Sequence, residues 1–276
     1  MYSRVYIEIG NICNKNCSFC HKTKRAKRQM SFDEFEKVVA ALSGVTEYLY
    51  FHVMGEPLLH PELCHFIDYA SERGFKCAIT TNGTLLDKMG EALLASKVYK
   101  VNISLHSFED GSNEEHLAYV NSCLDFAGRA SAGGILTVLR LWNRGFDKGR
   151  NISVLEMAKE KFPDGEWKFS DRGARIRHKL HVEYGERFEW PDLNSRDLGD
   201  EVFCYGLGDH FGILCDGTVT PCCLDCEGDI ALGNIFTDDI SDILLSDRAC
   251  EMKEGFSRRH ATEALCRRCG YARRFG

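Results

Sequence analysis

Strand-like and helix-like segments alternate from residue 4 to residue 182, and this alternation limits the possible folds more than any other feature of the chain. Short runs rich in Val, Ile, Tyr and Phe are typical of strands, and stretches with apolar residues at helical spacing separate them. The sequence predicts strands at residues 4–9, 48–53, 75–80, 98–105, 135–141 and 174–182. Strands that alternate with helices pair in parallel through right-handed crossovers. We therefore expect an α/β fold, and the pattern alone leaves open whether its sheet is open or closed into a barrel.

The bulk composition is that of a soluble globular protein. The chain has 276 residues, of which 44% are hydrophobic and 28% charged, which suits one large domain or one domain with a small second one. Its net charge of −6 gives no overall attraction to nucleic acid or to a membrane surface. It has neither an apolar run of about 18 residues, as a membrane-spanning helix requires, nor a signal-peptide pattern. We expect a cytoplasmic protein without nucleic-acid or membrane partners.

Three local patterns predict features outside the strands. Ser31 and Glu34 have the spacing of a capping box, so a helix should follow Ser31. Asp216-Gly217 between two apolar runs is a hairpin turn signal. The basic run at residues 21–28 is either a solvated loop or the rim of an active site that meets an anionic substrate or an electron donor.

Fourteen cysteines in a protein without a secretion signal favour metal binding over disulfides. Three of them, Cys13, Cys17 and Cys20, lie within eight residues at the spacing C-x3-C-x2-C. Three thiolates on one loop suit a soft metal centre, whereas a structural zinc or a closed iron–sulfur cluster takes four protein ligands. Three thiolates therefore leave one metal position open to a non-protein ligand. A zinc site with a distant fourth ligand, or three surface thiols, are the alternatives.

With Phe19 just before the last cysteine, this loop resembles the signature of the radical S-adenosylmethionine (radical SAM) enzymes. The resemblance covers roughly residues 1–185 and implies a partial (β/α)6 barrel. It also implies a [4Fe–4S] cluster on the three cysteines, with a fourth iron that binds SAM. In the family, one electron from that cluster cleaves SAM to methionine and a 5'-deoxyadenosyl radical, which abstracts hydrogen from the substrate. An electron donor such as flavodoxin or ferredoxin is an implied partner.

Polar residues follow several predicted strands, at the end where parallel α/β folds collect ligands. Gly55-Glu56-Pro57 follows the second strand and is similar to the GGEP motif of the family, with Met54 in place of the first glycine. The resemblance implies that this motif contacts the amino group of SAM. Thr81 and Asn82 after the third strand, and Ser104 at the end of the fourth, are also implied near the cofactor. A simple turn at residues 55–57 and a helix cap at Thr81 and Asn82 are the alternatives.

Four further residues are candidates for the site. Arg140 and Asn143 end the fifth strand, where related enzymes hold the adenine and carboxylate of SAM, and an arginine suits a carboxylate. A salt-bridged barrel rim is the alternative there. Glu8 on the first strand points either into the barrel toward substrate or outward, and His106 is either a structural group or a base. Arg140, Glu8 and His106 are the candidates for a catalytic role, and none of them is singled out.

The sequence changes character near residue 190, so we expect a radical SAM barrel over residues 1–189 and a hairpin-plus-helix domain over residues 190–276. Cys204, Cys222, Cys266 and Cys269 have the spacing C-x17-C…C-x2-C, which resembles the auxiliary-cluster domains called SPASM and twitch. The resemblance implies one auxiliary [4Fe–4S] cluster with four thiolate ligands, suited to electron transfer. Zinc is the alternative metal. The remaining cysteines are either replacement ligands (Cys215, Cys223, Cys226) or predicted core residues (Cys64, Cys77, Cys123, Cys250).

The resemblance to twitch-type radical SAM dehydrogenases implies a reaction as well as a cofactor. After hydrogen abstraction a substrate radical must lose an electron and a proton, and a nearby cluster can accept the electron. We therefore expect two-electron oxidation of a small polyol, aminocyclitol or sugar-like substrate. Modification of a ribosomal peptide or a protein side chain is the alternative within the family, and a non-catalytic iron–sulfur or zinc protein is the alternative of another class.

Overall fold

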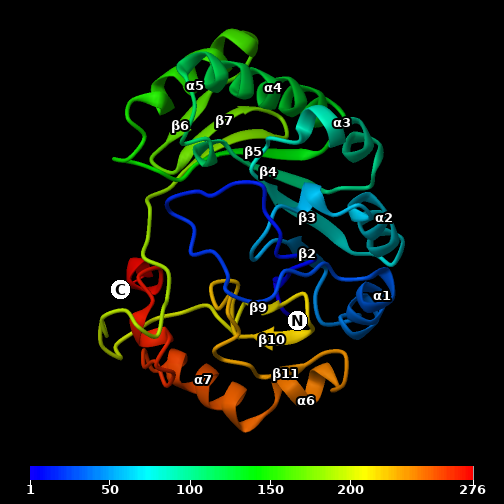
Figure 1. Ribbon diagram of the computed structural model, residues 1–276, viewed down its shortest axis with the longest axis vertical. Helices are drawn as coiled ribbons and strands as arrows, with labels where there is room; N and C mark the ends of the chain where they lie inside the picture. The colour runs from blue at the N-terminus through cyan, green and yellow to red at the C-terminus, as the bar shows by residue number, and fades with distance from the viewer. Residues whose placement is uncertain (276) are drawn as a thin grey trace. The chain divides into compact units, whose positions relative to one another are not determined.

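The computed structural model describes residues 1–275, and the chain folds into two compact units (Figure 1). The first unit comprises residues 1–13, 20–55 and 188–276, and the second comprises residues 14–19 and 56–187. The cysteine loop is therefore divided, because Cys13 and Cys20 belong to the first unit and Cys17 to the second. The predicted boundary between residues 189 and 190 remains a prediction about independent domains.

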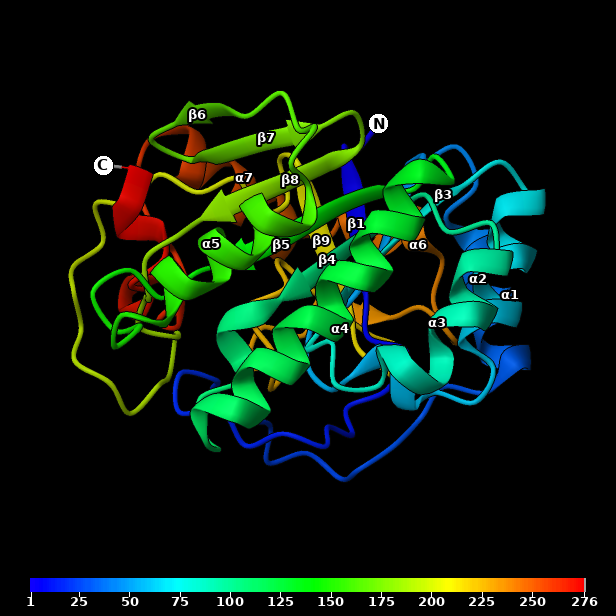
Figure 2. The same cartoon turned by 90° about the horizontal axis from the view of Figure 1, so that it is seen from above.

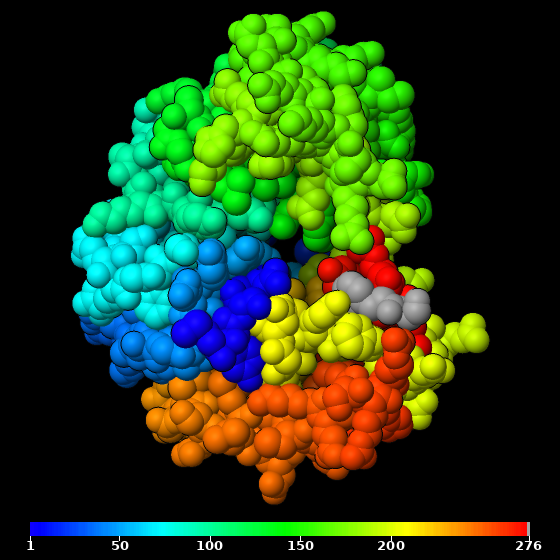
Figure 3. Space-filling model, turned by 180° about the vertical axis from the view of Figure 1, so that it is seen from behind, coloured from blue at the N-terminus to red at the C-terminus, as the bar shows by residue number. Residues whose placement is uncertain are grey.

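The first unit is built around β1, which has a parallel neighbour on each side. Val5 lies opposite Leu49 of β2 and Phe211 of β9, so the first strand of the chain pairs with one from its last third. The strand order is β11-β10-β9-β1-β2, with β10 antiparallel to both β9 and β11. These strands are β1 (Arg4–Ile7), β2 (Tyr48–Phe51), β9 (His210–Ile213), β10 (Thr218–Thr220) and β11 (Gly233–Asn234). In Figure 3 the blue N-terminal residues lie against the yellow segment that carries β9 and β10.

The helices of the first unit begin where the sequence offers a cap. The predicted capping box is present: the Ser31 side chain accepts from the Glu34 backbone, and the Glu34 carboxylate accepts from the Ser31 backbone. The helix that follows packs Phe35 against Phe51 of β2, both with no exposed surface. Asp216-Gly217 forms the predicted hairpin turn between β9 and β10. The helices are α1 (Phe32–Ala41), α6 (Ile240–Leu244), α7 (Asp247–Ser257), η3 (Cys266–Arg268) and η4 (Ala272–Phe275).

The second unit contains four parallel strands, and two further strands pair antiparallel at one edge of them. The order is β3-β4-β5-β8-β7-β6, and β3, β4, β5 and β8 run parallel. The predicted strand at residues 174–182 is wrong in detail, because the chain turns at Lys179 (φ 62°) and returns antiparallel. The strand that pairs with β5 is the second arm of this hairpin. The strands are β3 (Lys76–Thr81), β4 (Lys100–Ser104), β5 (Leu136–Leu141), β6 (Lys168–Ser170), β7 (Gly173–Arg177) and β8 (Leu180–Tyr184).

Helices connect the parallel strands of the second unit and pack against them. In Figure 2, α4 lies across β4 and β5, and it contacts both β5 and β8. The elements are η1 (Pro57–Leu59), α2 (Leu63–Glu72), α3 (Leu86–Ala95), η2 (Leu105–Ser107), α4 (Asn113–Ala132) and α5 (Arg150–Lys161). The expected α/β fold with parallel strands and helical crossovers is confirmed, and the strands do not close into a complete barrel. Among residues 1–275, no helix is both long and apolar enough to cross a membrane.

Candidate active site

The three cysteines of the N-terminal loop lie in a segment without regular secondary structure, and none of them forms a disulfide. In the first unit, the Cys20 Sγ lies 3.9 Å from the Met54 Sδ. In the second unit, the Cys17 Sγ lies 3.5 Å from the Ser107 carbonyl oxygen. Cys13 is exposed, whereas Cys17 and Cys20 are half-buried. The loop thus offers three reduced thiols, the donor type that an iron–sulfur cluster takes.

Gly55 is required where it stands, because the start of the cysteine loop packs directly on it. Its φ is +82°, and a Cβ atom there would lie 2.3 Å from the Gly10 carbonyl oxygen and 3.0 Å from that of Ile12. A side chain would therefore be strained in its own backbone and would displace the residues that lead into Cys13. The close approach explains why a glycine precedes Glu56, independently of any cofactor.

Glu56, at the start of the second unit, is buried among hydrogen-bond donors. Its Oε1 accepts from the Thr81 hydroxyl at 2.6 Å and from the Leu58 backbone at 3.1 Å, and its Oε2 accepts from the Asn82 backbone at 2.7 Å. Burial raises the pKa of this carboxyl above its usual range, while the three donors oppose the shift. Pro57 begins η1, where its missing N–H has no cost. The structure joins Glu56, Thr81 and Asn82 by hydrogen bonds, and their contact with SAM stays a prediction.

Asn82 ties several neighbouring segments of the second unit to this network. Its amide nitrogen donates to the Asn14 Oδ1 at 2.8 Å, which holds the cysteine loop next to Cys17. Its backbone oxygen accepts from the hydroxyls of Ser107 and Tyr119. Ser104 is three residues before Ser107. It is half-buried, ends β4 and directly precedes η2. The end of β3 is thus fixed by hydrogen bonds to the loop that carries Cys17.

A polar row crosses one face of the parallel strands. The Thr80 hydroxyl accepts from the Asn102 amide at 3.2 Å and from the Arg140 Nη1 at 3.5 Å, and the Arg140 Nε donates to Glu183 at 3.2 Å. Ile103, next to Asn102, lies beside side chains of α4, so Asn102 faces away from the helices. Asn102 has no exposed surface, yet its Oδ1 has no hydrogen-bond partner among the described residues. A buried acceptor of this kind fits a site that receives a ligand or an ordered water.

His106 lies beside Arg140 and remains neutral. Its Nδ1 lies 3.1 Å from the Arg140 carbonyl oxygen, which accepts from a protonated Nδ1, and 3.4 Å from the Trp142 backbone nitrogen, which donates to an unprotonated one. Burial, helped by the charges of Arg140 and Arg187, lowers the pKa of His106 to about 4. The Asn143 Oδ1 accepts from Asn151 at 2.9 Å, which orients its side chain toward α5. These groups form the polar rim that follows β4 and β5.

Sequence reasoning missed two acidic partners in the second unit. Glu183 pairs with Arg140, because β8 places it directly opposite that residue. Glu109 accepts from the Ser18 backbone and hydroxyl and pairs with Arg187 at 2.8 Å. Both contacts join residues that are distant in the chain, and no local sequence pattern predicts them. Glu183 takes its position from the β7–β8 hairpin, which the sequence analysis did not predict.

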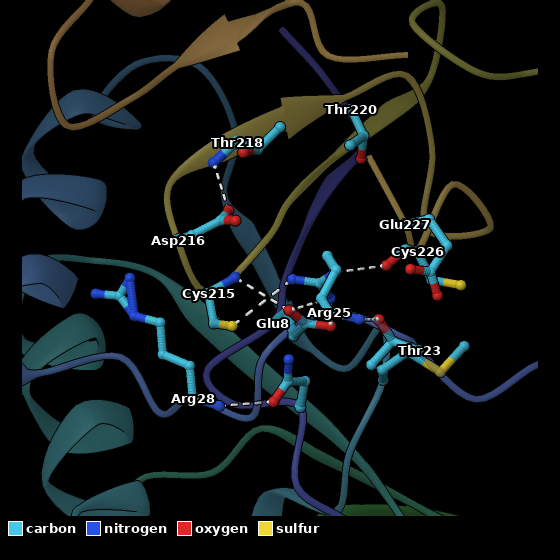
Figure 4. Close-up of polar contacts among 12 residues, drawn as sticks. Glu8, Thr23, Arg25, Arg28, Cys215, Asp216, Thr218, Thr220, Cys226 and Glu227 are labelled. Carbon is cyan, nitrogen blue, oxygen red and sulfur yellow. Dashed lines mark hydrogen bonds and ion pairs between the residues drawn. The ribbon is translucent and has the colours of Figure 1, made fainter. Parts of the chain in front are cut away.

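Glu8, a predicted catalytic candidate, is committed to an internal ion pair of the first unit. Its side chain has no exposed surface, and both carboxylate oxygens accept from the Arg25 Nη2 at 2.6 Å (Figure 4). The Cys215 backbone donates to the same carboxylate at 3.1 Å. Arg25 also lies 3.8 Å from the Cys215 Sγ. The basic run at residues 21–28 is therefore not simply a solvated loop, since its arginine at position 25 is structural.

The four predicted auxiliary cysteines lie near one another in the first unit. Burial raises the pKa of the Cys222 thiol well above its usual range, and charge on Cys223, Cys204, Cys269 and Cys266 would raise it further. The Gly206 backbone donates to the Cys204 Sγ at 3.3 Å, a contact typical of a cluster ligand. One of the four cysteines is buried and three are half-buried, and thiols so close together cannot all ionise unless cations compensate their charge. This donor set fits a fully protein-ligated iron–sulfur cluster.

The cysteines to which the sequence analysis assigned no definite role lie in different surroundings. Cys223 interacts electrostatically with Cys204 and Cys269, so it lies close to the auxiliary group. Cys215 and Cys226 instead contact Arg25. Among the predicted core cysteines, Cys77 and Cys123 are buried and Cys64 is half-buried. Cys250 was predicted to be a core residue, and this is wrong: it is exposed on α7, because the buried face of that helix is formed by other residues.

Comparison with known families identifies the class of protein. The model described as "Radical SAM superfamily" matches residues 7–170, which is more than half of the chain. The chain therefore belongs to the radical SAM superfamily of enzymes, and it takes the [4Fe–4S] cluster and SAM as cofactors. A second model, described as "Iron-sulfur cluster-binding domain" (SPASM), matches residues 204–270. The chain is thus a radical SAM protein with a SPASM domain for an auxiliary cluster.

Two solved structures share the fold over nearly the whole of this chain, at low sequence identity. The structure of BtrN in complex with AdoMet and 2-DOIA covers 98% of this chain and 93% of its own, with a TM-score of 0.62 and 19% identity. Streptococcus suis SuiB bound to precursor peptide SuiA covers 98% of this chain and 70% of its own, with a TM-score of 0.57 and 16% identity.

One curated relative has higher identity over a shorter stretch. The tungsten-containing aldehyde ferredoxin oxidoreductase cofactor-modifying protein of Pyrococcus furiosus is 31% identical over 121 residues, which are 42% of this chain and 34% of the relative. The chain spans between 34% and 50% of the first curated relatives it matches.

Proposed function

We propose that this enzyme oxidises a hydroxyl-bearing carbon of a small polyol, aminocyclitol or sugar-like substrate by two electrons. One observation carries the proposal: the four gathered thiols of Cys204, Cys222, Cys266 and Cys269 suit a single closed cluster, the type that transfers electrons without binding substrate. Further support is that BtrN, with which this chain shares its fold over 93% of BtrN's length, is described in complex with a small molecule.

Within this proposal, each half of the cofactor site has its own residues. Cys13, Cys17 and Cys20 hold the cluster that binds SAM. Glu56, the backbone at Gly55 and Pro57, and the polar strand ends at Thr81, Asn82, Ser104 and Asn143 receive SAM itself. When bound, these cofactors supply a 5'-deoxyadenosyl radical and, at the auxiliary cluster, an acceptor for one electron. The electron that starts the reaction comes from a flavodoxin- or ferredoxin-type donor.

The polar row on β3, β4, β5 and β8 binds the substrate. Thr80, Asn102, Arg140 and Glu183 present hydroxyl, amide, guanidinium and carboxylate groups on one face, a set that matches a molecule with several hydroxyl groups. A carbon that has lost a hydrogen atom becomes a carbonyl carbon when its hydroxyl loses a proton and the carbon loses an electron. The Glu183 carboxylate, 40% exposed and oriented by Arg140, accepts that proton.

The test uses reduced, reconstituted enzyme with SAM and a panel of carbon-deuterated polyols, amino sugars and peptides. Deuterium should pass from one small hydroxylated compound to 5'-deoxyadenosine, and a carbonyl product should accumulate in equal amount. Glu183→Gln should lower product formation by about 100-fold while 5'-deoxyadenosine still forms. Glu186→Gln, an exposed acid on the same segment, is the matched control and should be unchanged. If only peptides transfer deuterium, the proposal is wrong.

Peptide modification is the second candidate, because SuiB shares the fold and is described with a bound precursor peptide. It predicts that the panel's peptides transfer deuterium and that small polyols do not. An iron count separates the metal alternatives: about eight irons per chain indicate two cubane clusters, whereas about four irons with one zinc place zinc at the auxiliary cysteines. In the second case the auxiliary zinc could not accept an electron, and the proposed two-electron oxidation would be wrong.

A further inference from the structure

Three side chains of different metal-binding types meet in the first unit, outside both predicted clusters. The ligand atoms of His21, Cys226 and Glu227 all lie within 4.8 Å of one another. His21 follows the N-terminal cysteine loop, whereas Cys226 and Glu227 lie beyond the β9–β10 hairpin, so two segments far apart in sequence supply the group. Cys226 is only 2% exposed, and the other two are half-buried. Figure 4 shows Cys226 and Glu227 side by side, next to Arg25.

Hydrogen bonds and a ring contact hold these three residues in place. The Lys24 backbone donates to both Glu227 carboxylate oxygens, at 3.0 and 3.3 Å, and the Arg25 Nε donates to the Cys226 carbonyl oxygen at 2.8 Å. Arg25 is itself fixed by the buried Glu8. The His21 ring stacks on Trp190, with centroids 6.1 Å apart and planes 28° apart. The side chains of His21 and Glu227 and the backbone of Cys226 are thus positioned by interactions that need no metal, which is what a preformed site requires.

The donor set selects the class of ion. A thiolate, an imidazole and a carboxylate together carry two negative charges, which balance a divalent cation. Thiolate and imidazole suit Zn²⁺ and disfavour Mg²⁺ and Ca²⁺, which take oxygen ligands. We propose that His21, Cys226 and Glu227 form a mononuclear zinc site, distinct from the two iron–sulfur clusters. Three protein ligands leave one position of the tetrahedral ion to water or another small ligand.

The site links the segment after Cys20 to the segment after Cys222. A zinc ion there would fix the distance between the chain that leaves the SAM-binding cysteines and the chain that leaves the auxiliary cysteines. This role does not depend on which substrate the enzyme oxidises, so the zinc site and the proposed reaction fail separately.

The experiment measures zinc and iron per chain in the reconstituted holoenzyme after one equivalent of Zn²⁺ and removal of loosely bound metal. We expect about one zinc per chain in the wild type, in addition to the iron. Cys226→Ser and Glu227→Gln should each weaken zinc binding by about tenfold or more and leave the iron count unchanged. The matched controls are Cys250→Ser and Glu160→Gln, both exposed positions, which should keep the zinc.

X-ray absorption at the zinc edge locates the ion. The proposed site predicts one sulfur at about 2.3 Å and two or three nitrogen or oxygen ligands at about 2.0–2.2 Å. Three or four sulfur neighbours would put the zinc at the cluster cysteines and overturn the proposal. So would zinc retention in both variants, or the absence of tight zinc in the wild type. Glu227→Gln keeps the size of the side chain, so it tests the site even if Cys226→Ser perturbs folding.

Discussion

At the scale of single residues, the molecule depends on a few buried charges whose partners come from distant parts of the chain. Glu8 is the clearest case, because its carboxylate has no exposed surface and shares Arg25 with the Cys215 and Cys226 segments. Residue types alone indicated that a buried carboxylate needs a partner. They could not identify Arg25 as that partner, because an ion pair between separate segments produces no regular spacing of residues in the sequence.

Removing Arg25 should destabilise the fold strongly. Arg25→Met leaves the Glu8 carboxylate buried without a counter-charge, and we expect a loss of about 3–5 kcal/mol in the free energy of unfolding. Urea titration of the reconstituted protein under anaerobic conditions measures it. Arg258→Met, which breaks the exposed pair with Glu254, is the control and should have little effect. An equal effect of the two substitutions would contradict the structural role of Glu8 and Arg25.

His106 should make the free energy of unfolding depend on pH. Burial lowers its pKa to about 4 in the folded state, against about 6.5 when unfolded, so the unfolded chain binds the extra proton between these values. Stability is therefore full above pH 6.5 and falls as pH decreases toward 4, by up to about 3 kcal/mol. His106→Gln should flatten the change in the urea midpoint between pH 7.5 and 5.5. An unchanged slope in this variant would show that other groups cause the acid sensitivity.

At the scale of elements, the sequence predicted features that depend on neighbours in the chain. The Ser31 and Glu34 capping box and the Asp216-Gly217 turn are both present, because a few consecutive residues determine them. The turn between β7 and β8 was missed because a lysine, and not a glycine or asparagine, takes the left-handed conformation at Lys179. In the candidate site, local motifs indicated Glu56, Thr81 and Asn82, and the structure adds the hydrogen bonds that join them. Glu183 required knowledge of the strand pairing.

The loop before Glu56 offers a matched pair of glycines. Gly55 and Gly44 both have positive φ, but a Cβ at Gly55 would meet the Gly10 carbonyl oxygen, whereas one at Gly44 would meet nothing within 4 Å. Gly44→Ala should therefore cost only about 1 kcal/mol of backbone strain. Gly55→Ala should in addition displace the residues before Cys13 and reduce SAM cleavage and iron at the N-terminal cluster. Iron content and 5'-deoxyadenosine yield measure this, and similar yields from both variants would contradict it.

At the scale of the whole molecule, the two compact units do not follow the order of the chain. Residues 1–13 and 20–55 fold with residues 188–276, since β9 completes one side of β1. Composition suggested a boundary near residue 190, where the chain changes character, but composition carries no information on which strands pair. The pairing of β1 with β9 is set by tertiary packing, so no local pattern predicts it.

Truncation tests whether residues 1–189 form an independent domain. A chain that ends at residue 189 lacks β9, β10 and β11, which leaves one edge of β1 unpaired and removes a donor from Glu8. We expect this fragment to be insoluble or rapidly digested by protease. Adding residues 190–276 as a separate polypeptide should restore solubility if the missing β9 is the cause. A soluble, protease-resistant fragment would instead establish the boundary that the sequence indicates.

The place of β1 also has a consequence for biosynthesis. The ribosome makes this strand before β2 and β9, and its neighbour β9 is complete only when residue 213 has been added. Contacts that close so long a loop form slowly, so the nascent chain keeps one edge of β1 unpaired until β9 has been made. Until then, this edge is open to pairing with a strand of another chain.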